Sequence, residues 1–417
     1  MKRIYWFLMI WLVVALHGLS VQAVTTITPE TEQLRQLSQQ AEISLITCSP
    51  SEDAVFTVYG HSALRIYDPV NKIDRVYNYG MFDFSKPNFV YRFAKGETDY
   101  YLGVSDFRYF LFEYMTRGSE VYEQVLNLQY KEKDALWQAL EWNIQPENRV
   151  YRYNFFFDNC ATRPVIMIEN NIQGVINFKS PENGPQIASS LAMTGVPACQ
   201  SFRDIINYCT RYRPWQTFGC DLVLGLPTDR TMTQRESFFI PDNVKNAFNQ
   251  AEIIREGISE PLVKKINILS ETDQQPATTP FYISPLFCFT ALFILILALT
   301  ISEVRKKKYY RMVDVVLFFC AAIAGCILFF LSFISVHSSI FPNISLLWLH
   351  PLHLAGVVLF SIKKLKMAAY WYHFINFAVI IIMLVVWIFV PQHFNIAFIP
   401  LIASLLLRSG RALFRKK

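Results

Sequence analysis

Five apolar segments in the last third of the chain restrict what it can fold into more than any other feature. They span residues 281–302, 312–335, 344–362, 367–390 and 396–408. The first four are long enough to cross a hydrocarbon core of roughly 30 Å, and the fifth is short enough to be re-entrant. Because lipid offers the backbone no hydrogen-bond partners, such segments must be helical. We therefore expect an all-α membrane domain of five transmembrane helices at 281–417.

The charges between these segments predict how they are oriented. Lys and Arg crowd into "VRKKKYYR" (304–311), "KKLK" (363–366) and the tail "RSGRALFRKK", whereas the loops "HSSIFPN" and "PQHFN" contain neither. By the positive-inside rule the basic segments face the cytoplasm, and the residues before 281 lie outside. The net charge of the chain is +6, and thirteen of its Lys and Arg residues lie in these three segments. Without them, the rest of the chain is acidic. We therefore reject a nucleic-acid partner.

The N-terminal run "MKRIYWFLMIWLVVALHGLSVQA" agrees with that orientation. It has two positive charges, an apolar stretch and a small-residue pattern that ends at Ala23. This is typical of a signal peptide at 1–23, with an uncleaved anchor helix as the alternative. Either form exports the domain that follows, at 24–280. The chain is thus predicted to be a multi-pass protein of the cytoplasmic (inner) membrane, with the 24–280 domain in the periplasm.

Residues 24–280 are enough for one compact domain with its own core, which we expect to be α+β. The patterns predict helices at 28–42, 131–144, from 158 onward, at 200–212 and near 242–256. They predict strands at 43–49 and 149–157. Two further β-rich runs, 55–67 and 73–82, flank the turn formers "DPVN" and indicate a hairpin.

Two residues of this domain suggest thiol chemistry. His61, in the middle of the strand-like "VYGHSALRIY", is its only histidine, and Cys160, in "FFFDNCATR", stands between a strand and a helix. The unpaired N–H groups of a first helical turn favour a thiolate and can bind an oxyanion. A thiol also needs a base, which imidazole supplies. The pair is a candidate catalytic dyad, and the alternative is a buried thiol with a hydrogen-bonded core histidine.

A third residue should orient the imidazole. If Tyr67 pairs with Lys72 across the turn, the antiparallel register places Asn78 opposite His61, where its amide can accept the ring N–H. A slip of one residue would bring Tyr77 or Tyr79 to that face instead. Asn78 is therefore the candidate third catalytic residue, and Tyr79 a candidate substrate contact.

Four more residues are candidates for binding substrate. Arg65 lies four residues after His61 on the same strand face, and Arg163 follows Cys160, so both are placed to bind a phosphate or a carbonyl oxygen. A structural ion pair is the alternative for each. His337 and Asn343 lie in the outer loop without Lys or Arg, where they are candidates for lining a lipid entrance.

Neither a metal nor a cofactor is expected. His350 and His353 are ionisable groups near the outer membrane face, which makes them functional candidates, but no carboxylate or cysteine accompanies them to complete a metal site. The spacings of Cys48, Cys199, Cys209 and Cys220 match neither zinc pairs nor C-x-x-C motifs. Disulfides among the last three, or free buried thiols, are both open.

Several motifs in order carry a resemblance to a known family. They are "SLITCSP", "VYGHSALRIYDP", "YNYGMFDF", "PENRVYRYNFFFDNCATR", "PWQTFGCDLVLG", "ESFFIP" and, in the membrane part, "SVHSSIFPNISLLWLHPLHL". Together they resemble a class of bacterial lipoprotein N-acyltransferases whose periplasmic domain is similar to permuted papain-like thiol enzymes, including lecithin:retinol acyltransferases. The resemblance implies that His61 and Cys160 are the catalytic pair. Pro164 departs from the family pattern, so either the helix kinks one turn after Cys160 or it starts at Pro164.

The resemblance also implies the reaction and the partners. Cys160 would take a fatty acyl chain from a phospholipid or lipoprotein donor as a thioester. The α-amine of the N-terminal diacylglyceryl cysteine of a lipoprotein would then receive it. A thiol hydrolase of the envelope, acting on phospholipid or on the cell wall, shares the thioester and is the alternative. A third reading, a non-enzymatic scaffold, conflicts with the intact "GHSA" and "NCATR" motifs.

Overall fold

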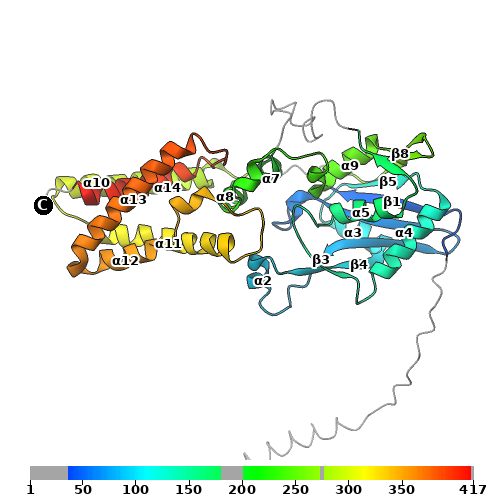
Figure 1. Cartoon of the computed structure of the whole chain (residues 1–417), viewed down its shortest axis with the longest axis horizontal. Coiled ribbons are helices and arrows are strands. Elements are labelled where there is room, and N and C mark those ends of the chain that lie inside the picture. The colour runs from blue at the N-terminus through cyan, green and yellow to red at the C-terminus, as the bar shows by residue number, and fades with distance from the viewer. Residues whose placement is uncertain (1–35, 180–200, 273–276, 415–417) are drawn as a thin grey trace, which may run out of the picture. The chain divides into compact units, whose positions relative to one another are not determined.

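The computed structural model describes residues 36–179, 201–272 and 277–414. The predicted signal peptide, most of the predicted helix 28–42 and Cys199 lie outside these residues, and 36–41 are not helical. From Leu37 onward the chain forms one compact unit. Its N-terminal part is a mixed α/β domain, and its C-terminal part is helical (Figure 1).

An antiparallel sheet is the frame of the N-terminal part. Within the described residues it has seven strands in the order β10-β5-β1-β2-β3-β4-β6 (Figure 1). The strands are β1 Glu42–Cys48, β2 His61–Asp68, β3 Ile73–Met81, β4 Asp99–Asp106, β5 Val121–Leu126, β6 Val150–Arg152 and β10 Val263–Ser270. The predicted strand at 43–49 and the hairpin around "DPVN" are confirmed.

The predicted strand 149–157 is wrong beyond Arg152. The side chain of Asn154 accepts hydrogen bonds from the backbone N–H groups of Phe156 and Phe157, which closes a turn at these residues. Asparagine competes in this way with the ladder hydrogen bonds of a strand. The chain thereby leaves the sheet before it reaches Cys160.

Helices cover both faces of the sheet. Side chains alternate between the faces, so Leu64 and Ile66 of β2 face α4 (Tyr130–Asn143), α5 (Thr162–Asn171) and α9 (Pro241–Gln250). Ala63 of β2 and Val76 of β3 face α3 (Phe107–Thr116) on the other side. The predicted helix at 131–144 is confirmed as α4.

The strand that carries His61 begins at that residue, so the expectation of a mid-strand histidine is wrong. Residues Thr57–Tyr59 form the short 3-10 helix η1, and Gly60 follows with φ +76°. A Cβ at Gly60 would lie 2.8 Å from the carbonyl oxygen of Cys48 on β1. Glycine alone combines that conformation with so close an approach, and it turns the chain into β2.

The remaining elements of the N-terminal part lie outside the large sheet. They are α2 Phe89–Lys95, α7 Phe202–Thr210, α8 Pro214–Val223, η2 Leu226–Asp229, η3 Glu236–Phe239 and the small sheet of β7 Val175–Asn177, β8 Glu252–Arg255 and β9 Ile258–Pro261. The predicted helix at 200–212 is confirmed as α7. The one near 242–256 is α9, which ends at Gln250, and β8 takes up its predicted end.

The helical part comprises α10 Pro285–Arg305, α11 Arg311–Phe333, α12 His353–Ser361, α13 Lys366–Trp387 and α14 Phe398–Leu413. Within the described residues, three helices are long and apolar enough to cross a membrane: Pro285–Arg305, Arg311–Phe333 and Lys363–Trp387. Three of the five expected spans are thus found by length and composition, and the other two segments form the shorter helices α12 and α14.

Segment 344–362 falls short because it is broken. It contains the 3-10 helix η5 Ile344–Leu347 and the short α12, and Pro351, which has no N–H to donate, stands between them.

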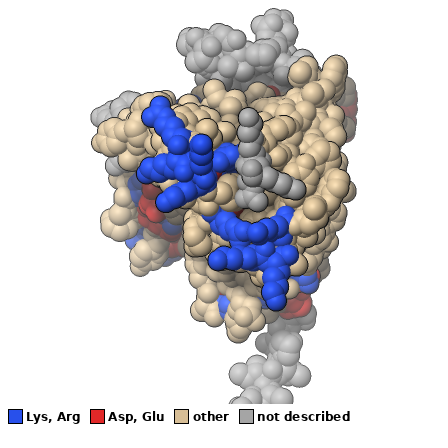
Figure 2. All heavy atoms as spheres, turned by 90° about the vertical axis from the view of Figure 1, so that its left-hand side faces the viewer, with Lys and Arg blue, Asp and Glu red and all other residues tan. Residues whose placement is uncertain are grey.

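Lys and Arg side chains gather in two groups on the end face that Figure 2 shows, as the positive-inside reading expects of the basic segments.

Candidate active site

A buried asparagine shapes the turn that presents Cys160. Asn159 is 2% exposed, and its Oδ1 accepts hydrogen bonds from the backbone N–H groups of Ala161 and Thr162, at 2.8 and 3.0 Å. Its Nδ2 donates to two backbone carbonyl groups. This is an Asx turn just ahead of α5, and it holds Cys160 beside the first turn of that helix. Asn159 was not among the candidates predicted from the sequence, although an asparagine just before a helix is a recognised start signal.

Pro164 causes neither of the two effects considered from the sequence. The regular helix α5 begins at Thr162, so Pro164 is its third residue. At that position in the first turn a backbone N–H has no helical partner, and its loss costs no hydrogen bond. The helix that follows Cys160 is therefore continuous.

His61 and Asn78 are in contact, although the hairpin register differs from the predicted one. The structure pairs Tyr67 with Asp74, a shift of two residues from the predicted partner Lys72. The Nε2 atom of His61 and the Oδ1 atom of Asn78 nevertheless lie 2.5 Å apart. Side chains alternate with a period of two, so a shift of two leaves Asn78 on the same face, within diagonal reach.

The register differs because Asp68 ends its strand. Its carboxylate accepts hydrogen bonds from the backbone N–H groups of Val70 and Asn71. Asp68 then pairs with Ile73, and Lys72 closes the turn with φ +57°. Aspartate commonly caps a turn in this way, which favours a loop at 69–72 over one at 68–71.

Gly80 brings β3 against the turn of Cys160. It has φ +90°, and a Cβ placed on it would lie 3.2 Å from the Cβ of Cys160. The observed pairing of β2 with β3 ends at Leu64 and Tyr77. Extended by three residues in the same register, it places Gly80 opposite His61. His61, Asn78 and Cys160 therefore converge at one end of the strands β2 and β3. Within the described residues no direct hydrogen bond joins the His61 ring to Sγ of Cys160, and such contacts commonly tighten only when substrate binds.

The surroundings of His61 keep its imidazole neutral. Burial lowers its pKa from 6.5 to about 4; the hydrogen bond to Asn78 acts against this, and the charge of Arg117 adds to it. The ring also stacks on Tyr114 of α3, with centroids 5.7 Å apart. If Nε2 donates its proton to Asn78, then Nδ1 carries the free lone pair and is the atom that can accept a proton.

The surroundings of Cys160 keep its thiol protonated. Burial raises its pKa from 9.0 to about 11, while the backbone N–H groups of Ser62 and of Cys160 itself act in the opposite direction. The N–H group of Cys160 favours the thiolate, as the sequence predicted, but burial has the larger effect and the thiol is the resting form. The same two N–H groups are placed to bind an oxyanion that forms on a carbonyl next to the sulfur.

The raised pKa predicts slow alkylation of Cys160 at neutral pH. Only the thiolate reacts, so below its pKa the rate should climb about tenfold per pH unit. With iodoacetamide the rate should keep rising until pH is about 11. Peptide mass spectrometry at Cys160 measures it, and the unfolded protein, in which the thiol should titrate near 9, is the control. A plateau at or below pH 9 in the folded protein would show a stabilised thiolate.

Both candidate arginines are engaged in ion pairs. Arg65 binds Asp74 at 2.7 Å and Glu123 at 3.0 Å, along the face that α3 covers. Arg163 makes two hydrogen bonds to Asp158, at 2.5 and 2.8 Å. Its guanidinium lies 3.5 Å from the centroid of the Tyr151 ring. These contacts match the structural alternative for both residues.

The other candidates have different positions. Tyr79 is 1% exposed, faces the core on the side opposite Asn78, and donates its hydroxyl to Asn143 of α4 at 2.5 Å. The Nε2 atom of His337 lies 3.1 Å from the carbonyl oxygen of Phe93. Asn343 is buried. Its Nδ2 donates to two backbone carbonyl groups at the end of α8, and its Oδ1 accepts a hydrogen bond from the side chain of Gln392. Tyr79 and Asn343 are thus packed inside the protein, whereas His337 lies against α2.

The histidines near the outer face have protein partners. His353 is buried, with Nδ1 2.7 Å from the hydroxyl of Tyr372 and Nε2 2.9 Å from the carbonyl oxygen of Trp348. His350 stacks on it, with ring centroids 3.9 Å apart. The rings of His350 and His353 therefore pack against each other. Among the described residues Cys48, Cys209 and Cys220 are free thiols.

Two family models match the chain, one on each part. The Lnb N-terminal periplasmic domain matches residues 30–213, which include His61, Asn78 and Cys160. The Lnb transmembrane domain matches residues 276–417. Comparisons with curated proteins and with solved structures found no match. The chain is therefore an Lnb-type protein, a membrane protein with a periplasmic N-terminal domain and a helical transmembrane domain.

Proposed function

We propose that this protein is a cysteine-dependent lipoprotein N-acyltransferase of the cytoplasmic membrane. Its periplasmic thiol domain, with a permuted papain-like arrangement, would occupy 24–280, and the membrane domain 281–417. The acyl chain would pass through a thioester on Cys160 to the α-amine of a diacylglyceryl lipoprotein. The observation that supports this most is the convergence of His61, Asn78 and Cys160 at one sheet end in an Lnb-type chain.

Each of these residues has a role in the proposed first step. Sγ of Cys160 attacks the ester carbonyl as Nδ1 of His61 takes the thiol proton, since both groups are neutral at rest. The oxyanion is held by the N–H groups of Ser62 and Cys160. The ester C–O bond then breaks, and the leaving alcohol takes the proton from His61. Asn78 holds the imidazole in the tautomer that this requires.

The second step reverses the roles. The α-amine of the lipoprotein attacks the thioester carbonyl and loses a proton to His61. The C–S bond breaks, the amide is formed, and the thiolate of Cys160 recovers the proton from His61. A neutral imidazole is needed at the start of both steps, which its lowered pKa provides at neutral pH.

The decisive experiment compares lipoprotein N-termini from cells with and without the gene. We expect an N-acyl chain on the terminal diacylglyceryl cysteine only where the gene is present, and tandem mass spectrometry detects it. Identical N-termini in the two strains would contradict the transferase. Loss of phospholipid acyl chains without any change in lipoproteins would indicate the hydrolase instead.

A further inference from the structure

The short helix α2 presents apolar side chains to its surroundings. It has no buried residue, and Val90, Tyr91 and Phe93 are 78%, 54% and 53% exposed. Phe84, in the segment before the helix, is 66% exposed. An exposed apolar group of this kind on one short helix is typical of a contact with lipid or with a partner.

Three contacts hold α2 at the outer end of the candidate membrane helix α11. The rings of Tyr91 and Phe330 lie 5.8 Å apart, and the backbone N–H of Val336 donates to the carbonyl oxygen of Lys95 at 2.9 Å. His337 contacts the backbone of Phe93. Phe329 and Phe333, in the last turns of α11, are also exposed. The apolar surface of α2 is thus continuous with the exposed apolar end of α11.

A series of aromatic rings leads from α2 toward Cys160. The centroids of Phe93 and Phe89 are 6.2 Å apart, those of Phe89 and Phe82 5.8 Å, and those of Phe82 and Tyr100 5.1 Å. Phe82 lies two residues after Gly80, which contacts Cys160. The rings therefore run from α2 to the end of β3, where Gly80 lies beside the turn of Cys160.

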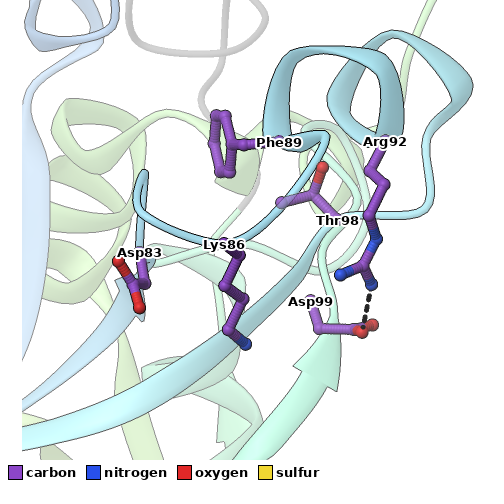
Figure 3. Close-up of a pocket in the computed structure, with 6 residues that line it drawn as sticks. All are labelled: Asp83, Lys86, Phe89, Arg92, Thr98 and Asp99. Carbon is purple, nitrogen blue, oxygen red and sulfur yellow. Dashed lines mark hydrogen bonds and ion pairs between the residues drawn. The ribbon is translucent and has the colours of Figure 1, made fainter. Parts of the chain in front are cut away.

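Two cations and two carboxylates line a small hollow on the polar side of α2. Asp83, Lys86, Phe89, Arg92, Thr98 and Asp99 line the hollow, whose volume of about 10 Å³ accommodates a single oxygen-sized group (Figure 3). Arg92 is paired with Asp99, and Lys86 has no ion-pair partner among the described residues. The hydroxyl of Thr98, a residue only 8% exposed, has no hydrogen-bond partner in the part of the chain that the structure describes.

We propose that α2 and the segment 82–88 receive the acyl donor, and that this donor is a phospholipid. One phosphate oxygen binds at the hollow between Lys86, Arg92 and the Thr98 hydroxyl, and an acyl chain lies along Phe89 and Phe93. The two cations of the hollow match a phosphate and its two carboxylates match an ammonium group, so the lining suits a zwitterionic phospholipid headgroup. The diacylglyceryl cysteine of a lipoprotein has an ammonium group but no phosphate for Lys86 and Arg92. The inference rests on the proposed function, and the lysophospholipid is the alcohol that leaves Cys160 in the first step.

Photocrosslinking in the full-length protein tests the site without catalysis. We place p-benzoylphenylalanine at Tyr91 or Phe93 in a Cys160→Ser background, in vesicles of phosphatidylethanolamine and phosphatidylglycerol with diacylated lipopeptide added. Matched controls carry it at Tyr109 or Phe112 of α3, which are 74% and 71% exposed. We expect phospholipid adducts several-fold more abundant at the α2 positions. Equal adduct yields on α2 and α3 would overturn the proposal, and so would adducts of α2 with lipopeptide alone.

Kinetics of the otherwise unchanged protein test the phosphate contact. Lys86→Gln is expected to raise KM for phospholipid several-fold and to leave KM for diacylated lipopeptide unchanged. Lys72→Gln, at the exposed turn of the β2–β3 hairpin, is the control and should change neither. Equal rises for both substrates, or no rise, would contradict the assignment. Adducts on α2 in a protein that transfers no acyl chain would refute the proposed function but leave the lipid site in place.

Discussion

Replacing Cys160 by serine or His61 by alanine should abolish N-acylation of lipoproteins while the protein stays folded and inserted in the membrane. Serine is a far weaker nucleophile than a thiol, and no other histidine belongs to the periplasmic domain to take the proton. A fall of at least about 10³-fold is expected, because nucleophile and base act as a unit. Mass spectrometry of lipoprotein N-termini in complemented cells measures it.

Two further variants set the scale of that result. Cys209→Ser makes the same chemical change at a free thiol of the same domain, outside the convergence of His61, Asn78 and Cys160, and should leave acylation intact. Asn78→Ala removes the partner of the His61 ring but neither reacting atom, so its effect should be smaller than the roughly 10²–10⁴-fold of general acid–base catalysis. Full N-acylation by either the Cys160 or the His61 variant would rule out the dyad.

The second large effect is expected at Arg203, on thermal stability. Its side chain is fully buried and bonds Asp229 at 2.8 Å and Asp221 at 3.3 Å. These carboxylates also accept hydrogen bonds from the segment between α13 and α14, Asp221 from the Asn395 side chain and Asp229 from the His393 backbone N–H. Arg203→Met leaves two buried carboxylates without their cation, which costs about 3–5 kcal/mol. The midpoint of thermal unfolding in detergent should fall accordingly.

Arg230 offers a matched control for that measurement. It pairs with Glu236 in the same domain, but its side chain is 49% exposed. Exposed pairs contribute only about 0–1 kcal/mol, so Arg230→Met should barely move the midpoint. Arg203→Lys should fall between the two, because an ammonium group keeps the charge but cannot reproduce the forked hydrogen bonds. If Arg203→Met and Arg230→Met melted at the same temperature, the Arg203 cluster would not stabilise the protein.

Much of the local structure could be predicted from the sequence because it depends on short patterns. The apolar alternation of β1 and β2 and the helical spacing of Leu136 and Leu140 each indicate one face of an element. The candidacy of His61 and Cys160 needed only the count of histidines and the position of a cysteine beside a helix. Asn78 emerged from a register that was wrong by two residues, because an even shift leaves the face of a strand unchanged.

Tertiary structure alone decided the ionisation of the site and the continuity of the apolar segments. The helix start beside Cys160 predicted a stabilised thiolate, but the protein packed around the sulfur raises its pKa, and residues far apart in sequence supply that packing. Hydropathy likewise predicted five spans, whereas the broken backbone around Pro351 leaves only a short helix there. The amino-acid composition gives the hydropathy of a segment. The desolvation of a thiol depends on the atoms packed around it, and the length of a helix depends on where its backbone hydrogen bonds end.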